Sequence, residues 1–135
     1  MNIVFQSEST GNAPVQSNLV DHLVMEHFEH VFSLISTFEI DPQESLKHTH
    51  QVFQAMAEKS HASTIGLYQE VVRVVRQMVA WSGFLEGVAR DSVLCWILKE
   101  ATPLNYDKIG EVMSMERDEV KHGIAAVRTI LISLV

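Results

Sequence analysis

The sequence predicts an all-α protein of about six helices. Turn-forming residues are scarce, with six glycines and three prolines in 135 residues, and a fold of many short β-strands would need more of them. Apolar residues instead recur three and four positions apart, which is the spacing of a buried helix face. Hydrophobic residues make up 47% of the chain and charged residues 20%, so most of the chain is expected to fold around a core.

The N-terminal segment is expected to lead from a flexible tail into the first helix. Residues 1–18 are rich in Ser, Asn, Gln and Gly and predict the tail. A helix is expected over residues 19–38, with Asn18 as its N-terminal cap. The apolar side chains that predict this helix are Leu19, Leu23, Phe28, Val31, Phe32, Ile35 and Phe38.

Two further helices are expected in the N-terminal half, residues 19–81. Asp41 is a strong candidate cap for the second helix, because Pro42 follows it and Glu44 lies three residues after it. This helix is expected to fade near Ser60, and the third is predicted over residues 64–81. Their apolar positions are Leu46, Val52, Phe53 and Met56, and then Ile65, Leu67, Tyr68, Val71, Val72, Val75 and Met78.

A short hinge, Trp-Ser-Gly-Phe-Leu-Glu-Gly, is expected to join this half to the C-terminal half, residues 88–135. Its Trp81 and Phe84 would be costly to expose, so the two halves are expected to pack together through them and Trp96. The C-terminal half is predicted to hold helices over residues 88–99, 106–113 and 116–134. Asn105 is the expected cap of the middle one, and Ser114 and Met115 form the corner after it.

Charge and cysteine content limit the classes of function. The formal net charge is −7, which opposes non-specific nucleic-acid binding. Residues 1–88 carry four Lys/Arg and ten Asp/Glu, and residues 89–135 carry six and seven, so the C-terminal half is the better candidate for touching DNA. The single cysteine, Cys95, lies in an apolar run and is expected to be a buried, inert thiol. No signal peptide or long apolar segment is evident, so a cytoplasmic protein without membrane contact is expected.

The last two predicted helices have the pattern of a helix-turn-helix. Such helices cross closely and need a small residue at the crossing, where Gly110 fits. Apolar residues at the right spacing would hold the second helix against the first: Val112, Met115, Val120 and Ile124. The second helix keeps a polar face that could enter the major groove, formed by Arg117, Asp118, Lys121, His122, Ala125 and Arg128.

Residues 90–131, about 42 residues, resemble region 4 of bacterial sigma factors, which binds the −35 promoter element. The match rests on Tyr106, Asp107, Ile109, Gly110, Val120, Lys121, Ile124 and Arg128, with Ser114 in place of the usual turn glycine. Residues 38–58 are similar to region 2 of the extracytoplasmic-function type, and residues 66–77 fall where that family has its −10 recognition helix. The resemblance implies a transcription regulator that binds promoter DNA, RNA polymerase or both, without a cofactor. It implies DNA contact by Arg117, Lys121, His122 and Arg128.

Two other functions stay open at this stage. Asp118 and Glu119 would repel phosphate, which favours a sigma-like module that docks a regulatory protein partner without binding DNA. The second alternative is a di-iron helical bundle enzyme, since such bundles combine two Glu-x-x-His pairs with further Glu residues. The candidates are the pairs Glu58–His61 and Glu119–His122, with Glu26, Glu29, Glu70 and Glu86. The chain has no phosphate-binding glycine loop and no evident nucleophile–base pair, so an enzyme is not expected.

Overall fold

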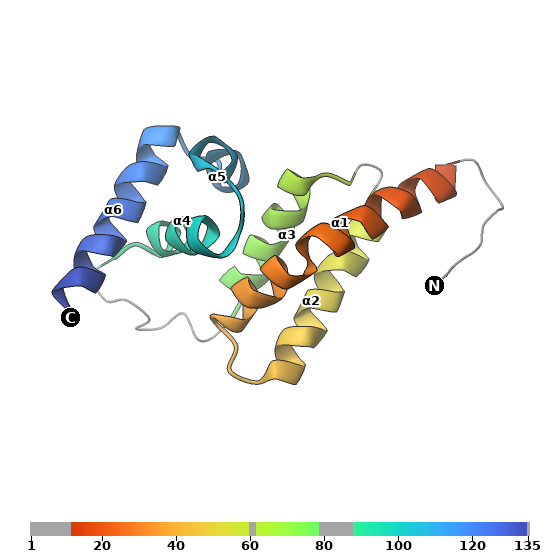
Figure 1. Cartoon of the computed structure of the whole chain (residues 1–135), viewed down its shortest axis with the longest axis horizontal. Helices are drawn as coiled ribbons and strands as arrows, with labels where there is room; N and C mark the ends of the chain where they lie inside the picture. The colour runs from red at the N-terminus through yellow and green to blue at the C-terminus, as the bar shows by residue number, and fades with distance from the viewer. Residues whose placement is uncertain (1–11, 60–61, 79–87, 135) are drawn as a thin grey trace.

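The computed structural model describes residues 12–59, 62–78 and 88–134, and it confirms the all-α prediction with six helices in these ranges. In chain order they are α1 (Asn12–Ser36), α2 (Pro42–Ala57), α3 (Thr64–Arg76), α4 (Arg90–Ala101), α5 (Tyr106–Met113) and α6 (Arg117–Ser133). Figure 1 shows α1, α2 and α3 at one end of an elongated molecule and α4, α5 and α6 at the other. None of the described helices is long and apolar enough to cross a bilayer.

The first helix is longer than its sequence pattern predicts. It begins at Asn12, so residues 12–18 are helical and Asn18 is not its cap, contrary to the expectation of a flexible tail that reaches residue 18. At the other end α1 stops at Ser36, and the backbone NH groups of Thr37 and Phe38 still donate to carbonyl groups of its last turn. Residues 1–11 lie outside the described part of the chain.

Side-chain caps lie at the starts of α2, α3 and α5. Asp41 accepts a hydrogen bond of 3.0 Å from the backbone NH of Gln43, so the predicted cap of α2 is confirmed. Ser63 caps α3 through the backbone NH of Gly66 at 3.0 Å. Asn105 caps α5 through the backbone NH of Lys108 at 2.8 Å, as its position in the sequence predicts.

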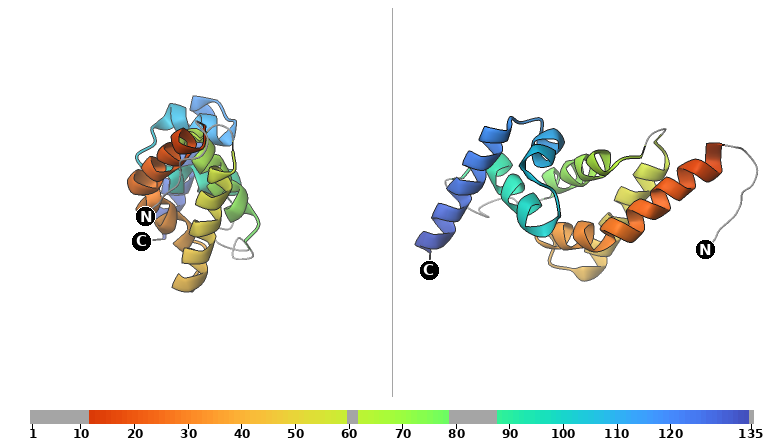
Figure 2. Two further views of the ribbon diagram at one scale, coloured as in Figure 1. Left: turned by 90° about the vertical axis from the view of Figure 1, so that its right-hand side faces the viewer. Right: turned by 45° about the horizontal axis from the view of Figure 1, so that its top comes forward.

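The two halves share one hydrophobic core. Helices α1 and α2 pack together at one end and α4 and α6 at the other, and α1 contacts α4 while α3 contacts α5 across the middle (Figure 2). Buried side chains from all of these helices form one cluster, against which Trp96 is partly buried. The predicted packing of the halves is therefore present, although Trp81 and Phe84 lie outside the described residues.

Leu46 and His27 are two departures from a simple apolar core. Leu46, which the sequence predicts to be buried on α2, is 41% exposed. His27 is buried on α1, where its Nδ1 lies 2.9 Å from the hydroxyl oxygen of the fully buried Tyr68 on α3. This hydrogen bond satisfies two polar groups at the contact between α1 and α3.

Candidate nucleic-acid interface

A tight corner joins α5 to α6. Ser114 has φ 57° and ψ 47°, the left-handed conformation in which helices commonly end, and it is the only described non-glycine residue with a positive φ. The backbone NH of Met115 donates to the carbonyl oxygen of Gly110 at 2.9 Å. A Cβ on Gly110 would lie 2.6 Å from the carbonyl oxygen of Met115. The prediction that a small residue is needed at this position is thus confirmed. The need arises because the backbone of the corner passes close to Gly110.

Apolar contacts hold α6 in a fixed position behind this corner. Val120, Ile124 and Val127 are almost fully buried, as are Ile109 and Val112 on α5. Helix α4 also packs along α6, and a Cβ on Gly123 would lie 2.9 Å from the hydroxyl oxygen of Ser92 on α4. The buried face therefore leaves a defined opposite face of α6 exposed, which is what a recognition helix requires.

The carboxylates at the start of α6 have different environments. Glu119 accepts a hydrogen bond of 2.9 Å from the backbone NH of Glu116, which satisfies one of the free NH groups at the helix start. Asp118 is exposed in the same turn. Negative charge here is favourable for the helix dipole, so the acidic start of α6 has a structural cause that is independent of any ligand.

All four residues that the sequence predicts for DNA contact are exposed on α6. Arg117 lies with its Nε 3.8 Å from a carboxylate oxygen of Asp107 on α5. His122 is exposed in the second turn of the helix. The structure thus places Arg117 beside the start of α5, whereas Lys121 and Arg128 turn toward a different group of residues.

Lys121 and Arg128 of α6 lie beside Tyr106 of α5 and Lys99 of α4. We call these four residues the Tyr106 patch. The ammonium nitrogens of Lys99 and Lys121 each lie 5.5 Å from the centre of the Tyr106 ring, within the range of a cation–π contact. Arg128 donates to Glu100 at 3.0 Å. This hydrogen bond raises the pKa of Arg128, with a smaller contribution from Tyr106. Cations from α4 and α6 therefore gather around one partly buried ring of α5.

The sequence did not identify Lys99 as part of this site. Lys99 lies in the last turn of α4, where a cation is ordinarily explained by the helix dipole. Its proximity to Lys121 depends on the packing of α4, α5 and α6, which no local pattern shows. Tyr106 was a signal in the sequence that could have been used, since the face of an aromatic ring attracts cations.

Two polar residues of the predicted −10 recognition segment on α3 bond to the C-terminal half. Gln69 donates from its amide nitrogen to the carbonyl oxygen of Glu111 on α5 at 3.3 Å. Arg76 forms an ion pair of 2.9 Å with Asp91 on α4. Gln69 and Arg76 of α3 are therefore bonded to the C-terminal half, whereas Arg73 and Gln77 are exposed.

The proposed di-iron residues do not gather in the described part of the chain. No group of three His, Cys, Asp or Glu side chains there has the arrangement of a metal site. Glu70 is paired with Arg73 and Glu119 caps α6, while His61 and Glu86 lie outside the described residues. Cys95 is buried as expected, and burial raises the pKa of its thiol to about 11.

Comparison with known proteins adds no further assignment. No protein-family model matches the chain, and neither a curated protein nor a solved structure shows significant similarity to it. Function is therefore inferred from the helix-turn-helix geometry and from the charges around it.

Proposed function

We propose that this protein is a sigma factor-like transcription regulator that binds promoter DNA through α6. The observation that supports this most is the combination of a locked helix-turn-helix with the Tyr106 patch. Three cations, Lys99, Lys121 and Arg128, converge there in a chain whose net charge is −7. A local excess of positive charge beside an exposed recognition helix is the arrangement that duplex DNA requires.

The roles of the cations follow from their positions. Lys121 lies in the second turn of α6, near the helix start where recognition helices meet base edges. Arg128 is two turns further along the same face and would meet phosphate. Lys99, on α4, would contact the neighbouring backbone.

Glu100 is the main group that opposes DNA binding at this site, because its carboxylate already forms an ion pair with Arg128. Both side chains are about half exposed, at 47% and 51%, and exposed pairs of this kind contribute about 0–1 kcal/mol. A DNA phosphate can therefore displace Glu100 at small cost. The acidic remainder of the protein predicts that binding is weak and strongly dependent on salt.

A fluorescence anisotropy titration with promoter and random duplexes at two salt concentrations tests the proposal. Lys121→Ala is expected to weaken promoter binding more than random binding, by about 1–3 kcal/mol, if Lys121 contacts a base. Arg128→Ala should weaken binding to both duplexes alike. It should also lower the slope of log affinity against log salt concentration by about one. Lys108→Ala is the matched control, because Lys108 is exposed on α5 and pairs with Glu111 outside the patch. Equal effects of all three variants would contradict DNA contact by the Tyr106 patch.

A second candidate function is a sigma-like module that docks a protein partner, such as RNA polymerase or a regulatory protein, without binding DNA. It is favoured by the ion pairs that tie Arg117 to Asp107 and Arg128 to Glu100, and by the core that joins the two halves. Asp118→Asn separates the two functions. It removes a repulsion and should raise affinity for random duplex if α6 meets DNA, and it should leave that affinity unchanged if α6 meets only protein.

A further inference from the structure

An open groove of about 860 Å³ lies between α1 and α2. The rings of Phe28 and Phe32 line it and are stacked with their centroids 6.4 Å apart. Both rings are only partly buried, and Leu46 lines the groove from α2 with 41% of its surface exposed. Met25 lies one turn before Phe28 on α1 and is 86% exposed, so it extends the same apolar surface. We call Met25, Phe28, Phe32 and Leu46 the α1–α2 groove.

The polar border of the α1–α2 groove is neutral or cationic. It is formed by Lys47, His50 and three glutamines, all on α2: Gln43, Gln51 and Gln54. None of the described residues that line the groove is an Asp or Glu, although the whole chain carries 17 of these against 10 Lys and Arg. Complementary charge favours the correct partner at an interface, so the groove is suited to a segment that is apolar and carries negative charge.

The C-terminal end of α6 is a segment of this kind. Ile132 is 75% exposed and Leu134 is 71% exposed, and we call these two residues the α6 end. The last carbonyl groups of a helix carry a partial negative charge. A Lys or Arg in the last turn can offset that charge, but α6 has none there. The α6 end therefore combines apolar side chains with a negative helix terminus.

The two surfaces together account for most of the large apolar side chains that the described chain exposes. Of five such residues, Met25 and Leu46 belong to the groove, and Ile132 and Leu134 form the α6 end. The fifth is Ile40. Grouped exposed apolar residues mark interaction sites, whereas isolated ones are ordinary. Figure 1 shows α1 and α2 at one end of the molecule and the end of α6 at the other, so the two surfaces cannot meet within one chain.

We propose that the α6 end of one copy of this chain docks into the α1–α2 groove of a second copy. Ile132 and Leu134 are buried against the aromatic rings of the groove, and Lys47 lies near the last carbonyl groups of α6. The two copies contribute different surfaces to this contact, so it is heterologous. A single helix end covers less than the roughly 1,200–2,000 Å² that stable interfaces bury, so the association is expected to be weak and concentration-dependent. It does not depend on DNA binding.

Sedimentation equilibrium of the full chain without DNA tests this contact. The weight-average mass of the wild-type protein should rise with concentration between about 0.01 and 1 mM. Leu46→Asp and Ile132→Asp should each abolish this rise, because a carboxylate would be buried without a partner. A one-to-one mixture of the two variants should form a dimer, because the Ile132→Asp protein keeps its groove and the Leu46→Asp protein keeps its α6 end. A contact between two copies of the same surface does not predict this recovery.

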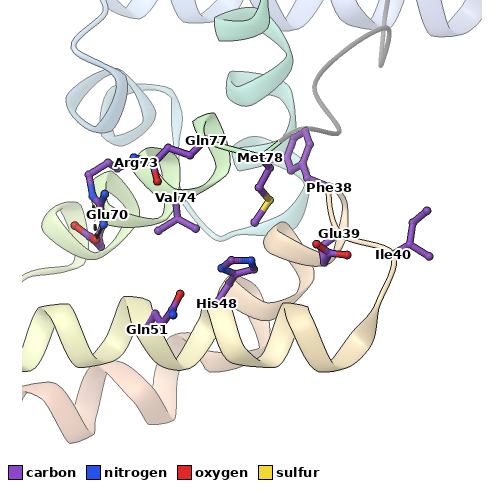
Figure 3. Close-up of a pocket in the computed structure, with 10 residues that line it drawn as sticks. All are labelled: Phe38, Glu39, Ile40, His48, Gln51, Glu70, Arg73, Val74, Gln77 and Met78. Atoms are coloured by element: carbon purple, nitrogen blue, oxygen red, sulfur yellow. Dashed lines mark hydrogen bonds and ion pairs between the residues drawn. The ribbon is translucent and has the colours of Figure 1, made fainter.

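Ile40→Asp is the matched control, because Ile40 is 97% exposed but lines a different pocket, between α2 and α3. Figure 3 shows its side chain directed away from the other residues of that pocket. This variant should associate like the wild-type protein. The proposal is overturned if Ile40→Asp loses association equally, if the wild-type protein stays monomeric up to about 1 mM, or if the mixture stays monomeric. Circular dichroism monitors folding, and Met25→Asp replaces Leu46→Asp if the latter unfolds.

Discussion

Substitution of Gly110 by alanine should destabilise the protein at the corner of the helix-turn-helix. Alanine is favoured over glycine within a helix by about 1 kcal/mol, so an open site would gain stability. At Gly110 the new Cβ would lie 2.6 Å from the carbonyl oxygen of Met115, a backbone atom that cannot move without opening the corner. Overpacking of this kind costs about 1–3 kcal/mol, and loss of the 2.9 Å bond from Met115 to Gly110 adds about 1 kcal/mol.

The net expectation for Gly110→Ala is a loss of about 1–3 kcal/mol in the free energy of unfolding. For a chain of this size that lowers Tm by about 4 °C per kcal/mol, which thermal unfolding followed by circular dichroism resolves. Gly66→Ala is the matched control, because its Cβ would meet only the side chains of Ser63 at 3.1 Å and Met56 at 3.5 Å. The Met56 side chain can move, and Ser63 needs to shift by only a few tenths of an ångström while it still caps α3, so this variant should be close to neutral. A Gly110→Ala protein as stable as Gly66→Ala would refute the close approach.

Three further predictions concern other parts of the molecule. Ser114→Gly should raise the free energy of unfolding by about 0.5–1 kcal/mol in urea titrations, since glycine adopts φ 57° without strain. Burial lowers the pKa of His27, so stability should be full above about pH 6.5, the unfolded value, and fall as the pH drops below it. His27→Gln should flatten this pH dependence of the urea midpoint. The Cys95 thiol, with its pKa raised to about 11, should react with a thiol reagent only in denaturant, and rapid native labelling would contradict its burial.

The helices were predictable where capping residues coincide with apolar spacing. Asn105 and the apolar positions after it predict α5 to the residue, and Asp41 with Pro42 predicts the start of α2. The start of α1 was missed because residues 12–18 are mostly polar, and a polar first stretch of helix resembles a tail in sequence. Leu46 was placed in the core because apolar spacing does not show which neighbours cover a helix. The error at Leu46 therefore arises from tertiary packing, which local propensity does not show.

The four residues predicted for DNA contact are exposed on α6 as the helix repeat predicts, but the sequence does not show which charges surround them. Lys121 and Arg128 are seven residues apart, and their shared face follows from the helix repeat alone. Their partners Lys99, Glu100 and Tyr106 come from α4 and α5, so the charge that a ligand meets depends on contacts between helices. A sum over residues 89–135 gives six cations against seven anions, yet this sum hides a cluster of cations beside a tyrosine. The distribution of charge, rather than its total, therefore decides whether α6 can contact DNA. For such contact by Arg128, the energetic cost is that of displacing Glu100 from its ion pair.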